Sequence, residues 1–256
     1  MCYDSNARPP EPPGEAGAAT GEDIELVSAD GTRFAAFVAR ASGGPSRSNV
    51  LIYPDVRGLH QFYKELALRL AEQGIDAVAI DYFGRTAGIG SRDESFEYMP
   101  HVQQIEFPSF LDDVKAAIAY LHSDGGEGSA TFTLGFCMGG ALSLLTAAED
   151  LDLSGAIALY AGFGRRFTGT DKSTLERAAD ISVPVLGLFG GADQGIPASD
   201  VQTLDENLDK TGVEHEIFIY PNAPHSFFDR KYAEFADESA DAWRRILGFV
   251  KAHSGK

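Results

Sequence analysis

The chain has 256 residues and a formal net charge of −17 at pH 7, and 44% of its residues are hydrophobic. This length suits a single α/β domain with a sizeable core. The strong negative charge argues against a nucleic-acid partner and against a basic helix lying on a membrane surface. Because only two cysteines occur, Cys2 and Cys137, neither a disulfide framework nor a cysteine zinc site is expected.

The first segment, residues 1–21, is rich in proline, glycine and alanine and is predicted to be a disordered tail. A single domain over 22–256 is expected to follow it. The segment lacks the charged and apolar blocks of a secretory signal, and no apolar run of the chain approaches a membrane span. We therefore expect a cytoplasmic protein without membrane contact, and the sequence leaves open whether it is a monomer or a dimer.

Predicted strands and helices alternate along the rest of the chain. An Asp-Gly turn at 29–32 separates two short apolar runs, 24–27 and 34–38, and predicts an antiparallel hairpin. Further strands are predicted at 50–53, 75–80, 131–136, 155–160, 183–189 and 215–220. Helices are predicted at about 61–73, 110–122, 198–210 and 231–253. This alternation predicts a doubly wound, mostly parallel sheet with helices on both faces and antiparallel edge strands. The stretch 81–106 is too long for a plain connection and is predicted to be a functional loop or a lid.

A motif typical of a nucleophile elbow lies between a predicted strand and a run of helix formers. It reads Gly135-Phe136-Cys137-Met138-Gly139-Gly140, with small residues two positions on either side of the cysteine. The start of the following helix presents its N–H groups and positive dipole end to the sulfur, which favours thiolate. A lone cysteine is more often a small core residue, so this interpretation needs partners elsewhere in the chain.

Two residues just after predicted strands supply candidate partners, because ligands of such sheets lie beyond the carboxyl ends of the strands. Asp193 follows the strand at 183–189, and His225 follows the strand at 215–220 and a proline-rich turn. The order nucleophile, acid, base is that of an α/β-hydrolase. Asp193 could instead cap the next helix, with Asp200 as a rival acid. His60 and His101 are rival bases.

These segments together resemble the dienelactone hydrolases, a family of the α/β-hydrolase superfamily. The resemblance rests on the elbow motif, on Gly191-Ala192-Asp193 with Ile196-Pro197, on Pro224-His225-Ser226-Phe227, and on Asp81-Tyr82-Phe83-Gly84-Arg85. It implies an α/β-hydrolase fold and a Cys137–His225–Asp193 triad. Such a triad would cleave an ester or lactone of a small carboxylate-bearing substrate through a thioester, with no metal and no organic cofactor.

The resemblance also implies roles for residues around the triad. It implies that Val56 and Met138 supply the oxyanion-hole N–H groups, and that an acid near the thiol is here Asp55 in place of the family's glutamate. Substrate-binding roles are implied for Tyr82 and for Arg85, which matches an arginine that holds the substrate carboxylate. A second family arginine is matched only one place further on, by Arg230, with Asp229 at the nearer position. Arg57 is a further candidate for that contact.

Three other functions stay open on the sequence. One is a general carboxylesterase or thioesterase with the same triad, since substrate choice depends on pocket shape. Another is a non-catalytic hydrolase-fold protein that binds a small molecule or a partner. A redox-sensing Cys137 is the third, and it lacks a nearby resolving cysteine.

Overall fold

The computed structural model describes residues 8–44, 46–123 and 128–255. Its centre is an eight-stranded sheet with the order β1-β2-β4-β3-β5-β6-β7-β8. The strands are β1 (Ala19–Val27), β2 (Arg33–Ala41), β3 (Ser48–Tyr53), β4 (Asp76–Ile80), β5 (Ala130–Phe136), β6 (Gly155–Leu159), β7 (Val185–Gly190) and β8 (His215–Tyr220). Strands β3 to β8 are parallel, and β2 joins β4 antiparallel. The predicted doubly wound, mostly parallel sheet with an N-terminal antiparallel hairpin is therefore confirmed, with longer hairpin strands than expected.

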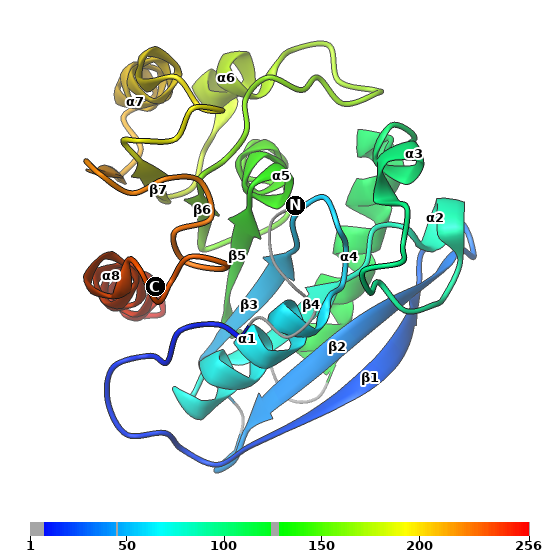
Figure 1. Cartoon of the computed structure of the whole chain (residues 1–256). Coiled ribbons are helices and arrows are strands. Elements are labelled where there is room, and N and C mark those ends of the chain that lie inside the picture. The colour runs from blue at the N-terminus through cyan, green and yellow to red at the C-terminus, as the bar shows by residue number, and fades with distance from the viewer. Residues whose placement is uncertain (1–7, 45, 124–127, 256) are drawn as a thin grey trace.

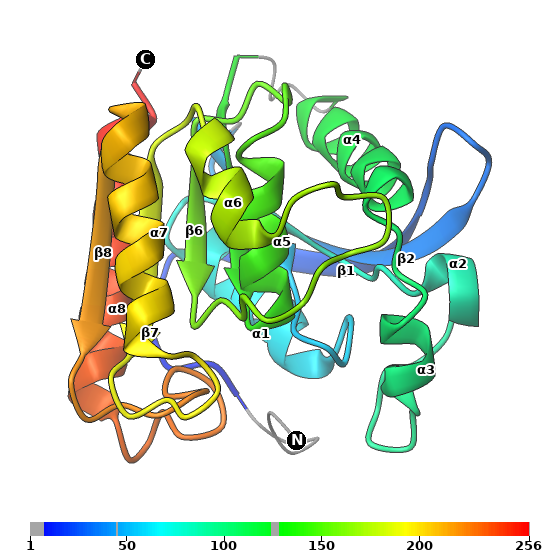
Figure 2. The same cartoon turned by 90° about the horizontal axis from the view of Figure 1, so that it is seen from above.

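Helices cover both faces of this sheet (Figures 1 and 2). The longer ones are α1 (Gln61–Glu72), α4 (Phe107–Ser123), α5 (Met138–Thr146), α7 (Ala198–Thr211) and α8 (Ala236–His253). Helices α1 and α8 lie on one face, and α4, α5 and α7 lie on the other. Short helices α2 (Gly84–Ala87), α3 (Tyr98–Val102), α6 (Thr174–Arg177) and the 3₁₀ turn η1 (Ala178–Asp180) occupy connections. No helix of the described residues is both long and apolar enough to cross a membrane.

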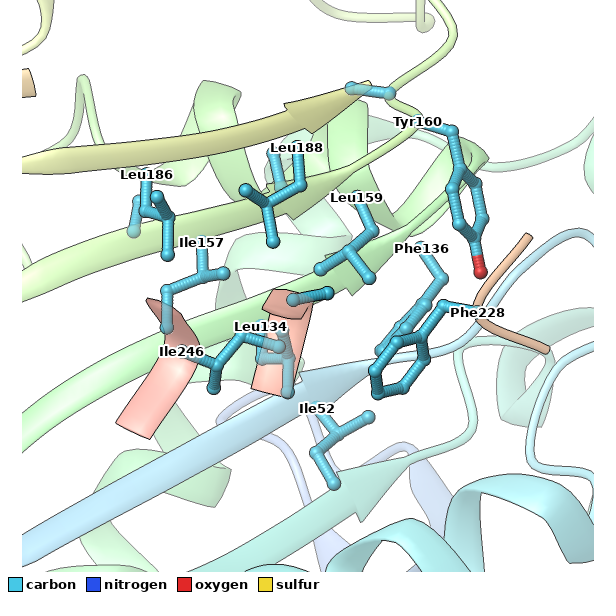
Figure 3. Close-up of a cluster of buried hydrophobic side chains, with 14 of the residues drawn as sticks. Ile52, Leu134, Phe136, Ile157, Leu159, Tyr160, Leu186, Leu188, Phe228 and Ile246 are labelled. Carbon is cyan, nitrogen blue, oxygen red and sulfur yellow. The ribbon is translucent and has the colours of Figure 1, made fainter. Parts of the chain in front are cut away.

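The core between the sheet and α8 is built from branched aliphatic side chains of the parallel strands. Figure 3 shows Leu134, Ile157 and Leu186 from neighbouring strands packed with Ile246 of α8. Phe136 and Phe228 lie at the other end of the same cluster, near the carboxyl ends of the strands. The inner parallel strands are covered by helices on both faces, so most side chains along them are buried and apolar. This core carries the strand ends that present the site.

Part of the segment predicted to be a disordered tail is packed against the domain. Residues Pro9 and Pro10 are buried, and the indole N–H of Trp243 donates to the Pro10 carbonyl at 2.9 Å. The Gly17 N–H donates to the Glu72 carbonyl at 2.8 Å, and β1 already begins at Ala19. Prolines lose little conformational entropy on ordering, so a short apolar contact is enough to hold them. The expectation of a tail fails for residues 8–21, whereas residues 1–7, with Cys2, lie outside the described residues.

The long connection after β4 is held to the sheet by a buried ion pair. Asp81 is fully buried, and Arg92 contacts it at 2.8 Å while also donating to the Gly88 carbonyl at 2.6 Å. The Arg92 guanidinium lies 4.5 Å from the centre of the Phe96 ring. The connection thus contains α2 and α3 and has its own internal packing, which a freely hinged loop would lack.

The last helix starts later than predicted, at Ala236 instead of about residue 231. Turns occupy residues 221–235, and Ser226 takes a φ of 62°, in the left-handed region. This irregular backbone carries His225 over the end of the sheet. A helix from residue 231 was expected because helix formers begin there, but the segment is used to place the side chains around His225.

Removing Arg92 should destabilise the protein, because Asp81 would be left as a buried charge without its cation. We expect Arg92→Met to lower the free energy of unfolding by about 3 to 5 kcal/mol, measured by urea denaturation. The double variant Asp81→Asn/Arg92→Met should recover much of that loss. Equal destabilisation by the single and double variants would contradict the ion-pair explanation.

Candidate active site

Cys137 lies at the tip of a sharp turn between β5 and α5, with φ 55° and ψ −112°. A Cβ at Gly135 would collide with the Gly139 backbone, and one at Gly139 would collide with the Tyr53 and Pro54 carbonyls. Only glycine therefore fits at these two positions. The Cys137 N–H donates to the Leu159 carbonyl at 3.1 Å, which ties the turn to β6. Cys137 is partly exposed, as is typical of the residue at the tip of a nucleophile elbow.

His225 and Asp193 meet at the same end of the sheet. The distance from His225 Nδ1 to Asp193 Oδ2 is 2.6 Å, and the Asp193 side chain is only 2% exposed. The other oxygen of Asp193 accepts the Gly195 N–H at 2.8 Å, which fixes the carboxylate. His225 is also hydrogen-bonded to the Cys137 side chain. The three residues that the sequence predicted to act together are thus brought into one chain of contacts.

The electrostatics favour a charged imidazole. Burial alone would lower the pKa of His225, but hydrogen bonds with Asp193 and Cys137 and the charges of both groups raise it to about 10. A protonated His225 beside the sulfur is the arrangement in which a thiolate–imidazolium pair is stable. Asp193 holds Nδ1, so Nε2 is the ring nitrogen left for proton transfer.

The rival acid and bases lie in other surroundings. His60 is the N-cap of α1, where its Nδ1 accepts the Phe62 N–H at 3.4 Å. Burial, followed by the Arg57 charge, lowers the pKa of His60 to about 4. His101 stacks on Phe96 with 5.1 Å between ring centres. Asp200 is in the first turn of α7. Of these candidates, Asp193 and His225 are the pair in contact.

Val56 and Met138 are the residues predicted to supply the oxyanion-hole N–H groups. Met138 is the first residue of α5, where an N–H has no acceptor within its own helix. Val56 follows β3, in a turn where the Gly58 N–H donates to the Asp55 carbonyl at 3.1 Å. Among the described residues, no hydrogen bond uses the N–H of Val56 or Met138. Their role as oxyanion-hole donors stays a prediction.

The loop between β3 and α1 is fixed by Tyr82, to which the resemblance gave a substrate-binding role, and by Asp55, the acid it placed near the thiol. Tyr82 is buried, and its hydroxyl donates to the Pro54 carbonyl at 2.6 Å and to that of Asp55. Asp55 is fully buried, its carboxylate accepts the Arg57 N–H at 2.9 Å, and its own N–H donates to the Tyr63 hydroxyl. Tyr82 thus supports the backbone that carries Val56.

Arg85 is engaged by residues of the hairpin turn and of α4. Its Nη1 contacts Asp30 and the Thr32 hydroxyl, its Nη2 contacts Asp113 at 2.8 Å and the Ser109 carbonyl at 3.1 Å, and its Nε contacts Asp113 at 3.4 Å. These contacts use all five N–H donors of a guanidinium. The resemblance implied a carboxylate-binding role for Arg85, and this geometry leaves it no donor for one.

The other two arginine candidates differ in burial. Arg57 is 4% exposed and lies close enough to His60 to lower the pKa of that imidazole. Arg230 is exposed, and its N–H donates to the Asp229 carboxylate. Their assignment to substrate binding stays a prediction.

Two residues beside the triad were missed by the sequence analysis. Tyr160 follows β6 with a φ of 36°, and its ring centre lies 4.9 Å from that of His225. Its hydroxyl donates to Asp229 at 2.7 Å, and Asp229 is 1% exposed. Burial, and then the charge of Asp55, raises the pKa of Asp229 to about 7. The rule that site residues follow strand ends could have found Tyr160, since it comes directly after β6.

Comparison with known proteins decides the family. The model of the dienelactone hydrolase family matches residues 34–254, nearly the whole chain. The chain belongs to the dienelactone hydrolase family. As a member, it is a carboxylic-ester hydrolase of the α/β-hydrolase superfamily. The predicted family and enzyme class are thereby confirmed.

Individual relatives agree with the family match. A "Carboxymethylenebutenolidase" of Rhodococcus opacus is 29% identical over 99% of this chain and 97% of its own length. A "Putative carboxymethylenebutenolidase" of Methylorubrum extorquens is 28% identical over 90% of this chain and 80% of its own. The crystal structure of a "Putative Dienelactone Hydrolase" of Klebsiella pneumoniae superposes with a TM-score of 0.80 at 26% identity, covering 92% of this chain and 99% of that one.

The coupling between His225 and Asp193 can be measured directly. We expect Asp193→Asn to lower the pKa of His225 well below its wild-type value of about 10, because the variant removes the negative charge and the charged acceptor. An NMR titration of the His225 ring resonances measures this pKa in both proteins. Asp200→Asn, which replaces the rival acid, should leave it unchanged. An unaltered pKa in Asp193→Asn would contradict the assignment.

Proposed function

We propose that this hydrolase cleaves a small-molecule ester or lactone with a Cys137–His225–Asp193 triad and a thioester acyl-enzyme. The observation that supports the triad most strongly is the continuous contact from Asp193 through His225 to the sulfur of the elbow. An activated cysteine needs a base within hydrogen-bond reach and a third group that orients the base. Asp193 meets that need through its contact with His225 Nδ1, while the Gly195 N–H holds its other carboxylate oxygen.

In the acylation step, the Cys137 thiolate attacks the substrate carbonyl carbon. The carbonyl electrons move onto oxygen, where the N–H groups of Val56 and Met138 donate hydrogen bonds to the oxyanion. A donor of this kind typically contributes about 3 to 4 kcal/mol to the transition state. The tetrahedral species then collapses, the C–O bond breaks, and the leaving oxygen takes the proton of His225.

Deacylation reverses these roles. His225, now neutral, removes a proton from water, and the resulting hydroxide attacks the thioester carbonyl. The C–S bond breaks, the acid product leaves, and the thiolate–imidazolium pair is restored. We assign to Asp55, fully buried at the end of β3, a place beside the thiol as the counterpart of the family's glutamate. Activated esters and lactones suit a thiolate nucleophile because their leaving groups depart readily.

The second candidate function is a general carboxylesterase or thioesterase that uses the same triad. One observation favours it over a dienelactone-type substrate: all the donors of Arg85 are engaged by Asp30, Thr32, Ser109 and Asp113. A substrate carboxylate would have to displace Asp30 or the buried Asp113 to bind that guanidinium. Substrates without a carboxylate need no such exchange.

Hydrolysis of a dienelactone and of p-nitrophenyl acetate, measured side by side, tests the function. We expect Cys137→Ala to reduce kcat/KM by about a thousandfold or more on whichever substrate the wild type turns over, because the nucleophile is gone. Glu234→Gln, which changes an exposed residue, should keep wild-type rates. Activity that survives in Cys137→Ala would contradict the proposed mechanism, and wild-type activity on the simple ester alone would support the second candidate.

A further inference from the structure

The surroundings of His225 beyond the triad are acidic. Asp229 is 1% exposed and accepts the Tyr160 hydroxyl at 2.7 Å, and the Tyr160 ring packs against the imidazole. Figure 3 shows Tyr160 beside Phe136, the residue before the nucleophile. Asp229 thus contacts the same tyrosine that packs against the imidazole of His225. Asp55, also fully buried, acts on Asp229 electrostatically from the loop after β3.

The groups that act on Asp229 come from three parts of the chain. Tyr160 faces it from the end of β6, Asp55 from the loop after β3, and His225 and the Arg230 N–H from its own segment. The positive charge of His225 acts on Asp229, and His225 already pairs with Asp193 and with the sulfur. A substrate carboxylate brought to the thiol would therefore be repelled by these acids, because charges interact more strongly in a buried site than in water.

We propose that this site selects against acyl groups that bear a carboxylate, and that Asp229 sets this selectivity. The substrate class is then an ester or lactone whose acyl part is uncharged or cationic. Like charges brought together in a desolvated site are strongly unfavourable, so one buried carboxylate is enough to discriminate. The proposal rests on Cys137 being the nucleophile of the proposed function, and it assigns Asp229 no part in the bond-making steps.

Alkylation of Cys137 by iodoacetamide and by iodoacetate measures this selectivity without any turnover. The two reagents form the same C–S bond with loss of iodide and differ in whether they carry a carboxylate. Peptide-resolved mass spectrometry separates Cys137 from Cys2, and a small neutral thiol such as N-acetylcysteinamide supplies the reference ratio. We expect the preference of Cys137 for iodoacetamide to exceed the reference by about tenfold or more.

Asp229→Asn is the matched variant, because asparagine keeps an oxygen that can accept the Tyr160 hydroxyl while removing the charge. We expect it to lower the excess preference severalfold. Glu234→Gln makes the same change in net charge at an exposed position and should leave the preference unchanged. Equal preferences in wild type and Asp229→Asn, or a wild-type ratio no higher than the reference, would overturn the proposal.

A pH series on the wild type gives the same test without a variant. The thiolate fraction of Cys137 enters both alkylation rates equally and cancels in their ratio. Because burial raises the pKa of Asp229 to about 7, its charge and hence the discrimination should grow as the pH rises through that value. The ratio should stay flatter in Asp229→Asn, and a wild-type ratio that falls as pH rises would contradict the role of Asp229.

The proposed function and this selectivity fail in different ways. Arg57 is the alternative residue that would attract an anionic reagent to the thiol. Faster alkylation of Cys137 by iodoacetate than by iodoacetamide, lost in Arg57→Met, would overturn the selectivity but not the triad. Ester hydrolysis that survives in Cys137→Ala would overturn the mechanism even if the alkylation ratios were as expected. Hydrolysis rates can also be measured side by side for a neutral ester and its carboxylate-bearing analogue. Faster hydrolysis of the neutral ester, lost in Cys137→Ala, would support both the mechanism and the selectivity.

Discussion

Two glycines beside Cys137 let β5 and α5 approach until their backbones touch, and the position of the nucleophile depends on that contact. The turn holds Cys137 at a φ of 55°, a conformation that costs a non-glycine residue about 1 to 3 kcal/mol. The surrounding packing offsets the strain, because the Cys137 N–H is bonded to Leu159 and any Cβ at Gly135 or Gly139 would meet backbone. With the sulfur fixed in this way, the loops after β7 and β8 need only deliver Asp193 and His225 to the same sheet edge. The parallel order of β5, β6, β7 and β8 does so, since their carboxyl ends share that edge.

The acidic composition of the chain determines how its arginines are used. The chain has 38 acidic and 21 basic residues, and two arginines of the connection after β4 are already paired with its own carboxylates. Arg92 is taken by Asp81 and holds the long connection in place, while Arg85 is taken by Asp113 and Asp30 and joins the hairpin turn to α4. Near the triad, by contrast, a carboxylate is buried against an aromatic side chain. Asp229 accepts the Tyr160 hydroxyl, and the charge of Asp55 acts on it. The proposed triad thus has the buried acids Asp229 and Asp55 in its electrostatic surroundings.

The sheet, the elbow and the Cys137–His225–Asp193 contact were predictable because each depends on local signals: apolar runs, glycine spacing, and residues just after strands. The contacts of Arg85 were not, because Asp30 and Asp113 are 55 and 28 residues away in sequence. The ordered residues 8–21 were missed for a similar reason, since Trp243 is separated from Pro10 by 233 positions. Tyr160 and Asp229 escaped notice because neither residue type signals a site by itself. Their meaning comes from the hydrogen bond between them and the ring packed on His225.

The central claim is that Cys137 forms a covalent thioester during hydrolysis, and rapid-quench mass spectrometry with p-nitrophenyl acetate or another turned-over ester tests it most directly. The claim predicts an acyl adduct on the peptide that contains Cys137, formed within the first turnover and released by neutral hydroxylamine. The adduct should be absent in Cys137→Ala and should persist longer in His225→Gln, because deacylation needs the imidazole to activate water. An adduct on another residue, or full turnover with Cys137 unmodified and replaceable by alanine, would contradict the claim.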